Sequence, residues 1–388
     1  MRPTRVGKPG RRAGIAHNRL SLHMRHRRIL AACIVCLSLP YALPPVYRLP
    51  APRPFAGPQL WNPYAGMRGT WRRANFHAHG RSWGGLTNGA QSDADVVAAY
   101  RARGYDVAGV SDYQHIAGGS TRTIPLYEHG FNVGKHHQLA IGARYVEWAD
   151  FPLWQGVHQK QYIIDRVKRS SDLLAINHPS RLHSYTVDDV RQLTGYDLIE
   201  LANGRVTTED RWDAALSSGH PVWAIGGDDT HDVTDVDRMA VAWNMIDAAS
   251  SSSADVIDAL RAGRSYTVMR TTDTMTPGDL TVVSVRVTDA TLTVTCAGPP
   301  ATFVFVGQNG VIRKTVTGVT SASYAITPDD TYIRTVVRDS RTDLFLNPIL
   351  RTDGGRLRVP VAVADPLWTA IIRATIVAAC AVVAWLLF

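Results

Sequence analysis

Between residues 71 and 270, short apolar runs alternate with stretches of helical periodicity, and this alternation limits what the chain can fold into. The segment "QSDADVVAAYRARGYDVAGVSD" contains one full period. Ser92 and Asp95 have the spacing of a capping box, Gly104 follows the helical stretch, and "DVAGVSD" is typical of a buried strand. The order returns at "TVDDVRQLTGYDLIELANG" and "TTEDRWDAALSSGHPVWAIGGDD". It predicts an α/β fold in which helices join parallel strands, either a barrel or an open doubly wound sheet.

The remaining sequence has a different period. Residues 276–360 alternate apolar and polar positions around turn signals such as Asn309-Gly310, with no helical stretch between them. This pattern predicts a small antiparallel, β-sandwich-like domain after an α/β domain at residues 71–272. Residues 48–70 are rich in Pro and Gly and show no period, which predicts a linker or an extended clasp.

The net charge of +9 belongs to one end of the chain. Residues 1–28 carry nine of the 42 Lys and Arg and no acid, so 33 basic residues face 33 acidic ones in the rest. The basic residues therefore form a tail, and we expect no nucleic-acid partner.

Both chain ends contain apolar segments, the first uncharged and the second with a single charge at Arg373. Residues 29–47 predict a transmembrane anchor or a signal segment, and residues 367–388 predict a C-terminal transmembrane helix, with a buried helix as the alternative. Because basic flanks stay on the cytoplasmic side, residues 1–28 are predicted to be a cytoplasmic tail. The body of the protein would then lie on the periplasmic side of a bacterial-type inner membrane, with the lipid bilayer as a partner.

Histidines and carboxylates follow the predicted strands of the α/β region. They are His77, His79, Asp112, Glu147, His178, Glu200, Asn203, Asp228, Asp229 and His231. The carboxyl ends of parallel barrel strands meet on one face, so these side chains are expected to converge there. Mixed imidazole and carboxylate sets suit Zn, Mn or Fe better than Mg or Ca, which prefer oxygen ligands.

The spacing of two pairs has a geometric reason. Side chains at positions i and i+2 of a strand point the same way, so His77 and His79 can reach one cation, as can Asp229 and His231. Either pair alone could equally be two polar residues at a strand end. The metal hypothesis rests on the whole ordered set.

The motifs "FHAH", "GVSD", "GARYVE", "INHP", "IELANG" and "GGDDTH" resemble, in this order, those of the polymerase-and-histidinol-phosphatase (PHP) family of metal-dependent phosphoesterases. The resemblance covers about residues 71–270 and implies a distorted (β/α)7 barrel that holds two or three metal ions at its strand ends. The segment containing "TYIRTVVRDSRTDLFLNPI" resembles the accessory β domain of a PHP branch that includes a carbaryl hydrolase.

The resemblance also implies a ligand set. The first ion would be held by His77, His79, Glu147 and Asp229. Glu147 would bridge to a second ion completed by His158 and His178. His231 would belong to a third ion, whose other expected ligands are replaced here by Asn88 and Tyr113. We therefore expect two divalent ions of Zn, Mn or Fe.

The implied activity is hydrolysis of a small-molecule ester, most simply a phosphoester, by a metal-activated water. The candidate catalytic side chains are Asp112, His115 and Asp228, with Tyr113 as a further candidate acid. Arg81, Arg181 and Asn203 are candidate substrate-binding residues, although arginines on loops are often only solvated. Two alternatives stay open: hydrolysis of a carboxyl or carbamate ester, and a degenerate barrel that acts as an envelope binding module. The sequence leaves the oligomeric state open.

Overall fold

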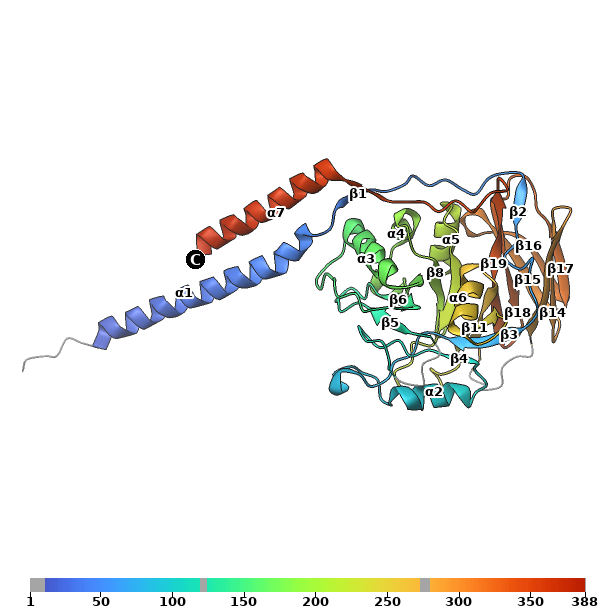
Figure 1. Ribbon diagram of the computed structural model, residues 1–388, viewed down its shortest axis with the longest axis horizontal. Helices are drawn as coiled ribbons and strands as arrows, with labels where there is room; N and C mark the ends of the chain where they lie inside the picture. The colour runs from blue at the N-terminus through green and yellow to red at the C-terminus, as the bar shows by residue number, and fades with distance from the viewer. Residues whose placement is uncertain (1–10, 119–123, 273–279, 388) are drawn as a thin grey trace, which may run out of the picture. The chain divides into compact units, whose positions relative to one another are not determined.

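The computed structural model describes residues 11–118, 124–272 and 280–387. It contains two compact units (Figure 1). One unit combines the chain ends, Met1–Arg48 and Val363–Phe388, and the other is Leu49–Ala362.

The terminal unit is built from two long helices and a short strand pair. Its elements are α1 (Arg11–Ser38), η1 (Leu39–Ala42), β1 (Val46–Arg48), β20 (Val363–Asp365) and α7 (Pro366–Leu387). Strands β1 and β20 pair antiparallel. The Arg373 guanidinium donates hydrogen bonds to the carbonyls of Ala42 and Leu43, at 2.9 and 2.8 Å, so α7 is fastened to the end of η1.

Among the described residues, α7 is the helix that is long and apolar enough to cross a membrane. The N-terminal span expected at residues 29–47 is not found there. The uncharged segment is helical only to Ala42, because prolines follow at positions 44 and 45. Residues 29–42 fall short of the roughly 20 residues that a span needs. The sidedness of the chain stays a prediction from its charges.

The larger unit contains a nine-stranded sheet that crosses the boundary predicted near residue 272. Its main path is β16 (Val311–Val319), β15 (Ala301–Gly307), β18 (Tyr332–Arg338), β19 (Thr342–Thr352), β12 (Ser265–Arg270), β11 (Ala242–Asp247), β3 (Trp71–Asn75) and β4 (Val107–Ala108), and β2 (Gln59–Trp61) pairs with β19. The α/β region and the β region therefore share one continuous set of backbone hydrogen bonds.

A six-stranded sheet holds most of the other strands of the α/β region. Its members are β10 (Trp223–Gly227), β8 (Leu198–Asn203), β7 (Leu173–Ile176), β6 (Gln138–Ile141) and β5 (Leu126–His129), with β9 (Val206–Thr207) beside β8. Strands β10, β8 and β7 are parallel, as predicted, whereas β6 is antiparallel to both β5 and β7. Strands β5 and β6 are joined by a short loop without a helix, which allows only antiparallel pairing.

Two isolated parallel bridges connect the ends of these sheets. Ala78, after β3, pairs with Thr230, after β10, and Tyr113, after β4, pairs with Glu128 in β5. The two sheets thus approach each other at both edges without a continuous ladder, and the closed (β/α)7 barrel stays a prediction.

The helices of the larger unit lie between these strands in sequence. They are η2 (Trp83–Gly85), α2 (Asp93–Arg101), α3 (Val157–Ser170), η3 (Arg181–His183), α4 (Val187–Gln192), α5 (Glu209–Ser217), α6 (Ser253–Arg261) and η4 (Gln308–Gly310). The predicted capping box at the start of α2 is confirmed, because the Ser92 hydroxyl accepts from the Asp95 N–H and the Asp95 carboxylate accepts in return.

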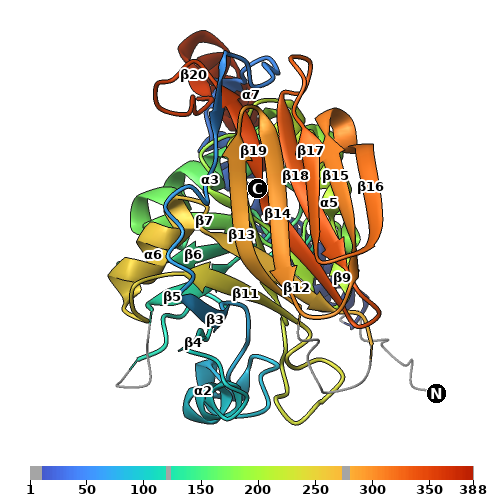
Figure 2. The ribbon, with the colours of Figure 1, turned by 90° about the vertical axis from the view of Figure 1, so that its right-hand side faces the viewer.

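The β region contains two antiparallel sets of strands whose buried side chains pack together. Strands β13 (Thr281–Thr288), β14 (Thr291–Ala297) and β17 (Ser321–Ala325) form a separate antiparallel sheet (Figure 2). Its buried side chains, such as Val294, pack in one core with Phe303 and Phe305 of the nine-stranded sheet. Strands β13 and β14 alternate buried and more exposed positions, and their buried side packs against the large sheet.

Part of the predicted linker belongs to the folded body. Strand β2 extends the large sheet beside β19, and Tyr64 is buried. The Tyr64 hydroxyl donates to the Ser265 carbonyl at 2.7 Å and accepts from the Asn347 N–H at 2.8 Å. Residues 59–64 therefore act as the extended clasp that the sequence left as an alternative.

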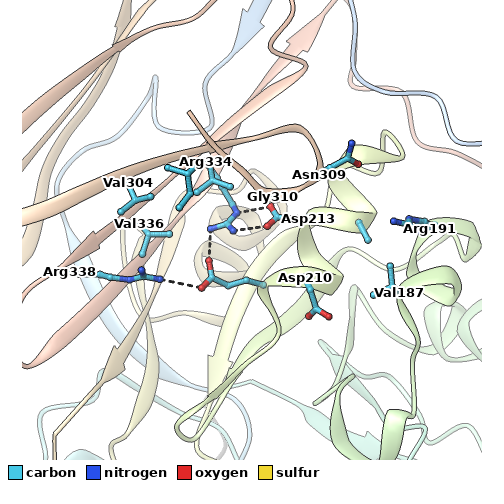
Figure 3. Close-up of a pocket in the computed structure, with 14 residues that line it drawn as sticks. Val187, Arg191, Asp210, Asp213, Val304, Asn309, Gly310, Arg334, Val336 and Arg338 are labelled. Atoms are coloured by element: carbon cyan, nitrogen blue, oxygen red, sulfur yellow. Dashed lines mark hydrogen bonds and ion pairs between the residues drawn. The ribbon is translucent and has the colours of Figure 1, made fainter. Parts of the chain in front are cut away.

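A buried ion cluster attaches α5 to the large sheet (Figure 3). The Arg334 guanidinium in β18 donates to both carboxylate oxygens of Asp213 at 2.7 Å, and it lies 2.8 Å from Glu209. Tyr332 also donates to Asp213, at 2.9 Å. Arg334 is only 2% exposed, so its charge depends on these two carboxylates.

His220 gives this unit an expected pH dependence. Burial lowers the pKa of His220 to about 4, so the folded protein holds the ring neutral. Below about pH 6.5 the unfolded chain binds a proton that the folded chain refuses, and stability is lost as the pH falls toward 4. In His220→Gln, this acid-induced loss should be smaller by about 2 kcal/mol. Urea unfolding at pH 7 and pH 4.5 measures it. The exposed His183→Gln should keep the wild-type dependence, and an unchanged dependence in both variants would contradict the assignment.

Candidate metal centre

The ends of β3 and β10 bring four of the predicted ligands together. The His79 N–H donates to the Thr230 carbonyl and the Asp229 N–H to the His77 carbonyl, both at 2.9 Å. These bonds flank the bridge between Ala78 and Thr230, so the side chains of residues 77 and 79 lie beside those of 229 and 231. The alternate spacing in each motif therefore has the geometric effect predicted for it.

The centre of the cluster is Glu128, in β5. Its Oε1 atom lies 3.0 Å from His137 Nδ1, 3.1 Å from His178 Nε2 and 3.2 Å from His77 Nε2, and its Oε2 atom lies 3.4 Å from His79 Nε2. The Glu128 side chain is fully buried. One carboxylate thus contacts four imidazoles from three separate segments of the chain.

Four triads of these side chains have ligand atoms close enough to hold a metal ion. They are His77, His79 and Glu128; Glu128, His137 and His178; His77, His178 and Asp229; and His79, Asp229 and His231. In each triad the ligand atoms lie within 4.8 Å of one another. Glu128 and Asp229 each belong to two of these triads, so neighbouring triads share a buried carboxylate.

Some nitrogen and oxygen atoms of the cluster that could bind a metal ion lack a hydrogen-bond partner. His77 Nε2 and Glu128 Oε2 are buried and have no hydrogen-bond partner, although both face other side chains of the cluster. A buried polar atom without a partner costs about 1 to 3 kcal/mol. A cation among these lone pairs would remove that cost.

The electrostatics favour a cation as well. Burial alone would raise the pKa of Glu128, but the neighbouring His137 and His77 outweigh it and hold the pKa well below its usual range. The same competition, with His77 and His79 against burial, lowers the pKa of Asp229. Burial and the neighbouring His79 lower the pKa of His231 to about 4, so its ring is neutral, as a metal ligand must be.

Two residues of the cluster have strained backbones. His178 has φ 25° and Asp229 has φ 49°, in the left-handed region that β-carbon-bearing residues seldom adopt. Both follow directly on a buried strand. Strain of this kind persists where the surrounding structure fixes a side chain in a functional position.

A further carboxylate supports the cluster from outside. Glu200 in β8 lies 2.7 Å from His77 Nδ1 and accepts the His178 N–H at 2.7 Å. The Asn203 amide donates to Glu200 at 3.1 Å and to Asp229 at 3.2 Å. Asn203, predicted to bind substrate, is therefore placed to orient two carboxylates.

Glu200→Ala should weaken metal binding because His77 loses the group that fixes its ring and tautomer. We expect a 10- to 100-fold higher metal Kd, measured by competition with a chelator of known affinity. The control is Asp255→Ala. It removes a carboxylate that accepts a hydrogen bond from Ser250 and belongs to none of the four triads. Equal affinity in the two variants would remove Glu200 from the site.

Two predicted ligands lie outside these triads. Glu147 pairs with Arg166 at 3.1 Å and accepts the Ala149 N–H at 2.9 Å, and His158 lies in the first turn of α3. The reason is that β6 ends at Ile141, so "GARYVE" continues as a loop and its Glu is not at a strand end. The structure puts Glu128 and His137 where the sequence analysis expected Glu147 and His158.

Glu128 and His137 were missed because their strands are short. The signal was present in "PLYEHG" and "HHQLAIG", two short apolar runs that carry a Glu-His pair and a His-His pair. With four residues each, these strands show too little alternation to be recognised by period.

The predicted catalytic residues divide into two groups. Asp228 accepts hydrogen bonds from the Tyr100 hydroxyl and from the N–H groups of Ala240, Val241 and Ala242, so both of its oxygens are engaged in holding a turn. Its expected role in proton transfer stays a prediction.

Asp112 and His115 remain beside the site. Asp112 accepts the Gly80 N–H at 2.7 Å, and burial together with Asp93 raises its pKa to about 7. The half-exposed His115 ring lies 3.6 Å from Asp112. This pair can pass a proton between the site and solvent.

The predicted phosphate-binding arginines also differ from each other. Arg81 donates to the Ala90 carbonyl and so closes its own loop. Arg181 donates to Asp229 at 2.9 Å while half of its side chain stays exposed. Of the two, Arg181 brings a positive charge to the cluster.

Aromatic rings cover one side of the cluster. The Tyr113 ring stacks on His79 with 4.6 Å between centroids, and His231 stacks on His79 at 4.3 Å. Tyr113 is the residue that, by the sequence resemblance, replaces an expected histidine ligand. Its phenol ring packs against His79.

Few known proteins are similar to this chain. No family model and no curated protein matches the chain. A solved structure from Bacteroides vulgatus, described as a two-domain protein containing a predicted PHP-like metal-dependent phosphoesterase, aligns with 81% of this chain and 100% of its own. The sequence identity is 13% and the TM-score is 0.41. The chain is thus a mixed α/β protein whose clustered His, Glu and Asp side chains could bind divalent metal ions.

Proposed function

We propose that the chain is a metal-dependent hydrolase of phosphoesters with a centre of the PHP type. The observation that carries the proposal is Glu128, a fully buried carboxylate shared by two potential ligand triads. Structural roles rarely leave several imidazoles and carboxylates buried together with unpartnered atoms. The sequence resemblance supplies the reaction class.

Bound divalent ions would supply an acidified water and neutralise the charge that develops on the attacked group. The chain's own residues do the rest. Glu200 and Asn203 hold His77 and Asp229 in place, and Arg181 offers its exposed guanidinium to an oxygen of the phosphoryl group.

The reaction consumes one water molecule. Its oxygen forms a bond to phosphorus, the ester P–O bond breaks, and the alcohol leaves with a proton. His115, next to Asp112, is the proposed donor of that proton because its ring is both half-exposed and within reach of a second titratable group.

We further propose that α7 anchors the protein in a membrane with the larger unit on the periplasmic side. The anchor is proposed from the length and apolar composition of α7. The periplasmic side additionally requires residues 29–47 to cross the membrane, because the basic N-terminal residues favour the cytoplasm. Protease treatment of spheroplasts tests it: digestion of the larger unit supports this orientation, and protection contradicts it.

The activity is tested with purified protein that has been stripped of metal and reloaded with Zn, Mn or Fe. The substrates are 4-nitrophenyl phosphate, bis(4-nitrophenyl) phosphate and 4-nitrophenyl acetate. Metal-dependent release from a phosphate ester, with no more than background release from the acetate, supports the proposal. Release from the acetate alone would identify a carboxyl esterase. If the reloaded protein contains only traces of metal and hydrolyses none of the substrates, the remaining hypothesis is a binding module without catalytic activity.

A further inference from the structure

Large apolar side chains are exposed on loops beside the candidate metal centre. Leu86 is 91% exposed, Val133 68% and Phe131 52%, and Trp148 and Trp154 are each more than half exposed. Single exposed apolar residues are common, but a group of them next to a site indicates a surface that binds something.

These loops are fastened to one another and to the site. The Trp83 indole donates to the Tyr113 carbonyl at 2.8 Å, and its ring packs edge-on against Trp148 at 5.8 Å. The Phe131 N–H donates to the Asp150 carboxylate at 2.7 Å, and the Val133 N–H donates to the Pro152 carbonyl at 3.0 Å. The exposed apolar side chains therefore stand on connected loops around Tyr113.

A cavity of about 470 Å³ lies among them. Leu86, Phe131 and Val133 supply its apolar wall, and Tyr113 and His137 connect it with the cluster. Its volume is within the range of small-molecule sites. Because His137 belongs both to the cavity wall and to a ligand triad, a molecule in the cavity is next to the place where a bond would be cleaved.

The charged residue that lines the cavity indicates which class of ligand could bind there. Among the described residues that line it, Lys135 carries a positive charge and none is a carboxylate. The Lys135 ammonium lies 5.9 Å from the centre of the Tyr113 ring. An apolar wall beside one cation suits a molecule with an apolar body and an anionic head.

We propose that this cavity binds the apolar part of the substrate, so that the preferred substrate is an amphiphilic phosphomonoester whose aryl or alkyl group rests on Leu86, Phe131 and Val133. This inference rests on the proposed function. Lys135 offsets charge on the phosphate, and hydrolysis releases inorganic phosphate and an apolar alcohol.

The test uses the full-length protein in nanodiscs and three substrates: phenyl, 4-ethylphenyl and 4-butylphenyl phosphate. Their leaving groups have similar acidity and differ in apolar length. The value of kcat/KM should rise about fourfold for each added methylene that is buried. In Phe131→Ala and Val133→Ser this rise with chain length should largely disappear. Val283→Ser, which changes an equally exposed valine on β13, should keep the full rise.

Binding gives a readout that needs no turnover. The matching 4-alkylphenyl phosphonates, which cannot be hydrolysed at the P–C bond, should bind more tightly with length in the wild type and less so in Phe131→Ala. Hydrolysis without length dependence in rate or binding overturns the cavity and keeps the proposed function. If no substrate is hydrolysed but binding depends on length and Phe131→Ala abolishes that dependence, the cavity is supported and the proposed function is overturned. A length effect equal in all variants shows that the apolar group partitions into the bilayer, which also overturns the cavity.

Discussion

Glu128→Gln is expected to remove bound metal and to lower hydrolysis by at least about 100-fold, because the amide loses the negative charge that the surrounding imidazoles and ions share. Glu128 contacts His77, His79, His137 and His178, so its charge is felt at every triad that contains one of them. Metal content by mass spectrometry and the rate on 4-nitrophenyl phosphate measure the two effects.

Glu147→Gln is the matched control for this experiment. Glu147 pairs with Arg166 on the flank of the cluster, so the change should leave metal content and rate within about twofold of wild type. The opposite result, with Glu147 essential and Glu128 dispensable, would restore the ligand set implied by the sequence resemblance and refute the cluster.

Asp213→Asn is expected to lower the free energy of unfolding by about 3 kcal/mol. The substitution keeps the side-chain volume but leaves the buried Arg334 guanidinium with one carboxylate, Glu209, in place of two. Removing one partner of a buried ion pair is costly because the other charge remains out of water. Urea unfolding at neutral pH measures the change.

Asp258→Asn provides the comparison for Asp213. Asp258 pairs with Arg261 across one helical turn, and both side chains are exposed. Such pairs contribute little, so a change below about 0.5 kcal/mol is expected. Equal effects of the two substitutions would show that the Arg334 cluster does not hold α5 to the sheet.

The sequence predicted those parts of the fold that depend on local pattern. The alternation in "DVVAAYRARGYDVAGV" gave helix α2 and strand β4, and period two gave the strands of the β region. The direction of β6 was not predictable from these patterns. It does not follow from the type of connection alone, since β6 pairs antiparallel with β7 although helix α3 joins them, and β5 and β6 are too short to be recognised by their period.

The site followed the same division. His77, His79, Asp229 and His231 were predictable because the i, i+2 spacing acts within a single strand end. His178 was predictable from its place after a recognisable apolar strand. Glu128 and His137 needed the pairing of β5 with β6, and Glu147 was named in their place because a motif in the sequence does not say where its strand ends.

The sequence by itself determined which residue types follow the carboxyl ends of the strands. Imidazoles and carboxylates are therefore available there to bind a metal. Only the tertiary structure decided which carboxylate is shared, since Glu128 reaches its histidines through contacts between segments up to 51 residues apart. It also decided that apolar loops surround this centre, because exposure is a property of packing and not of composition. Spacing along a strand is local and can be read in the chain, whereas the meeting of separate strand ends depends on how the whole unit folds.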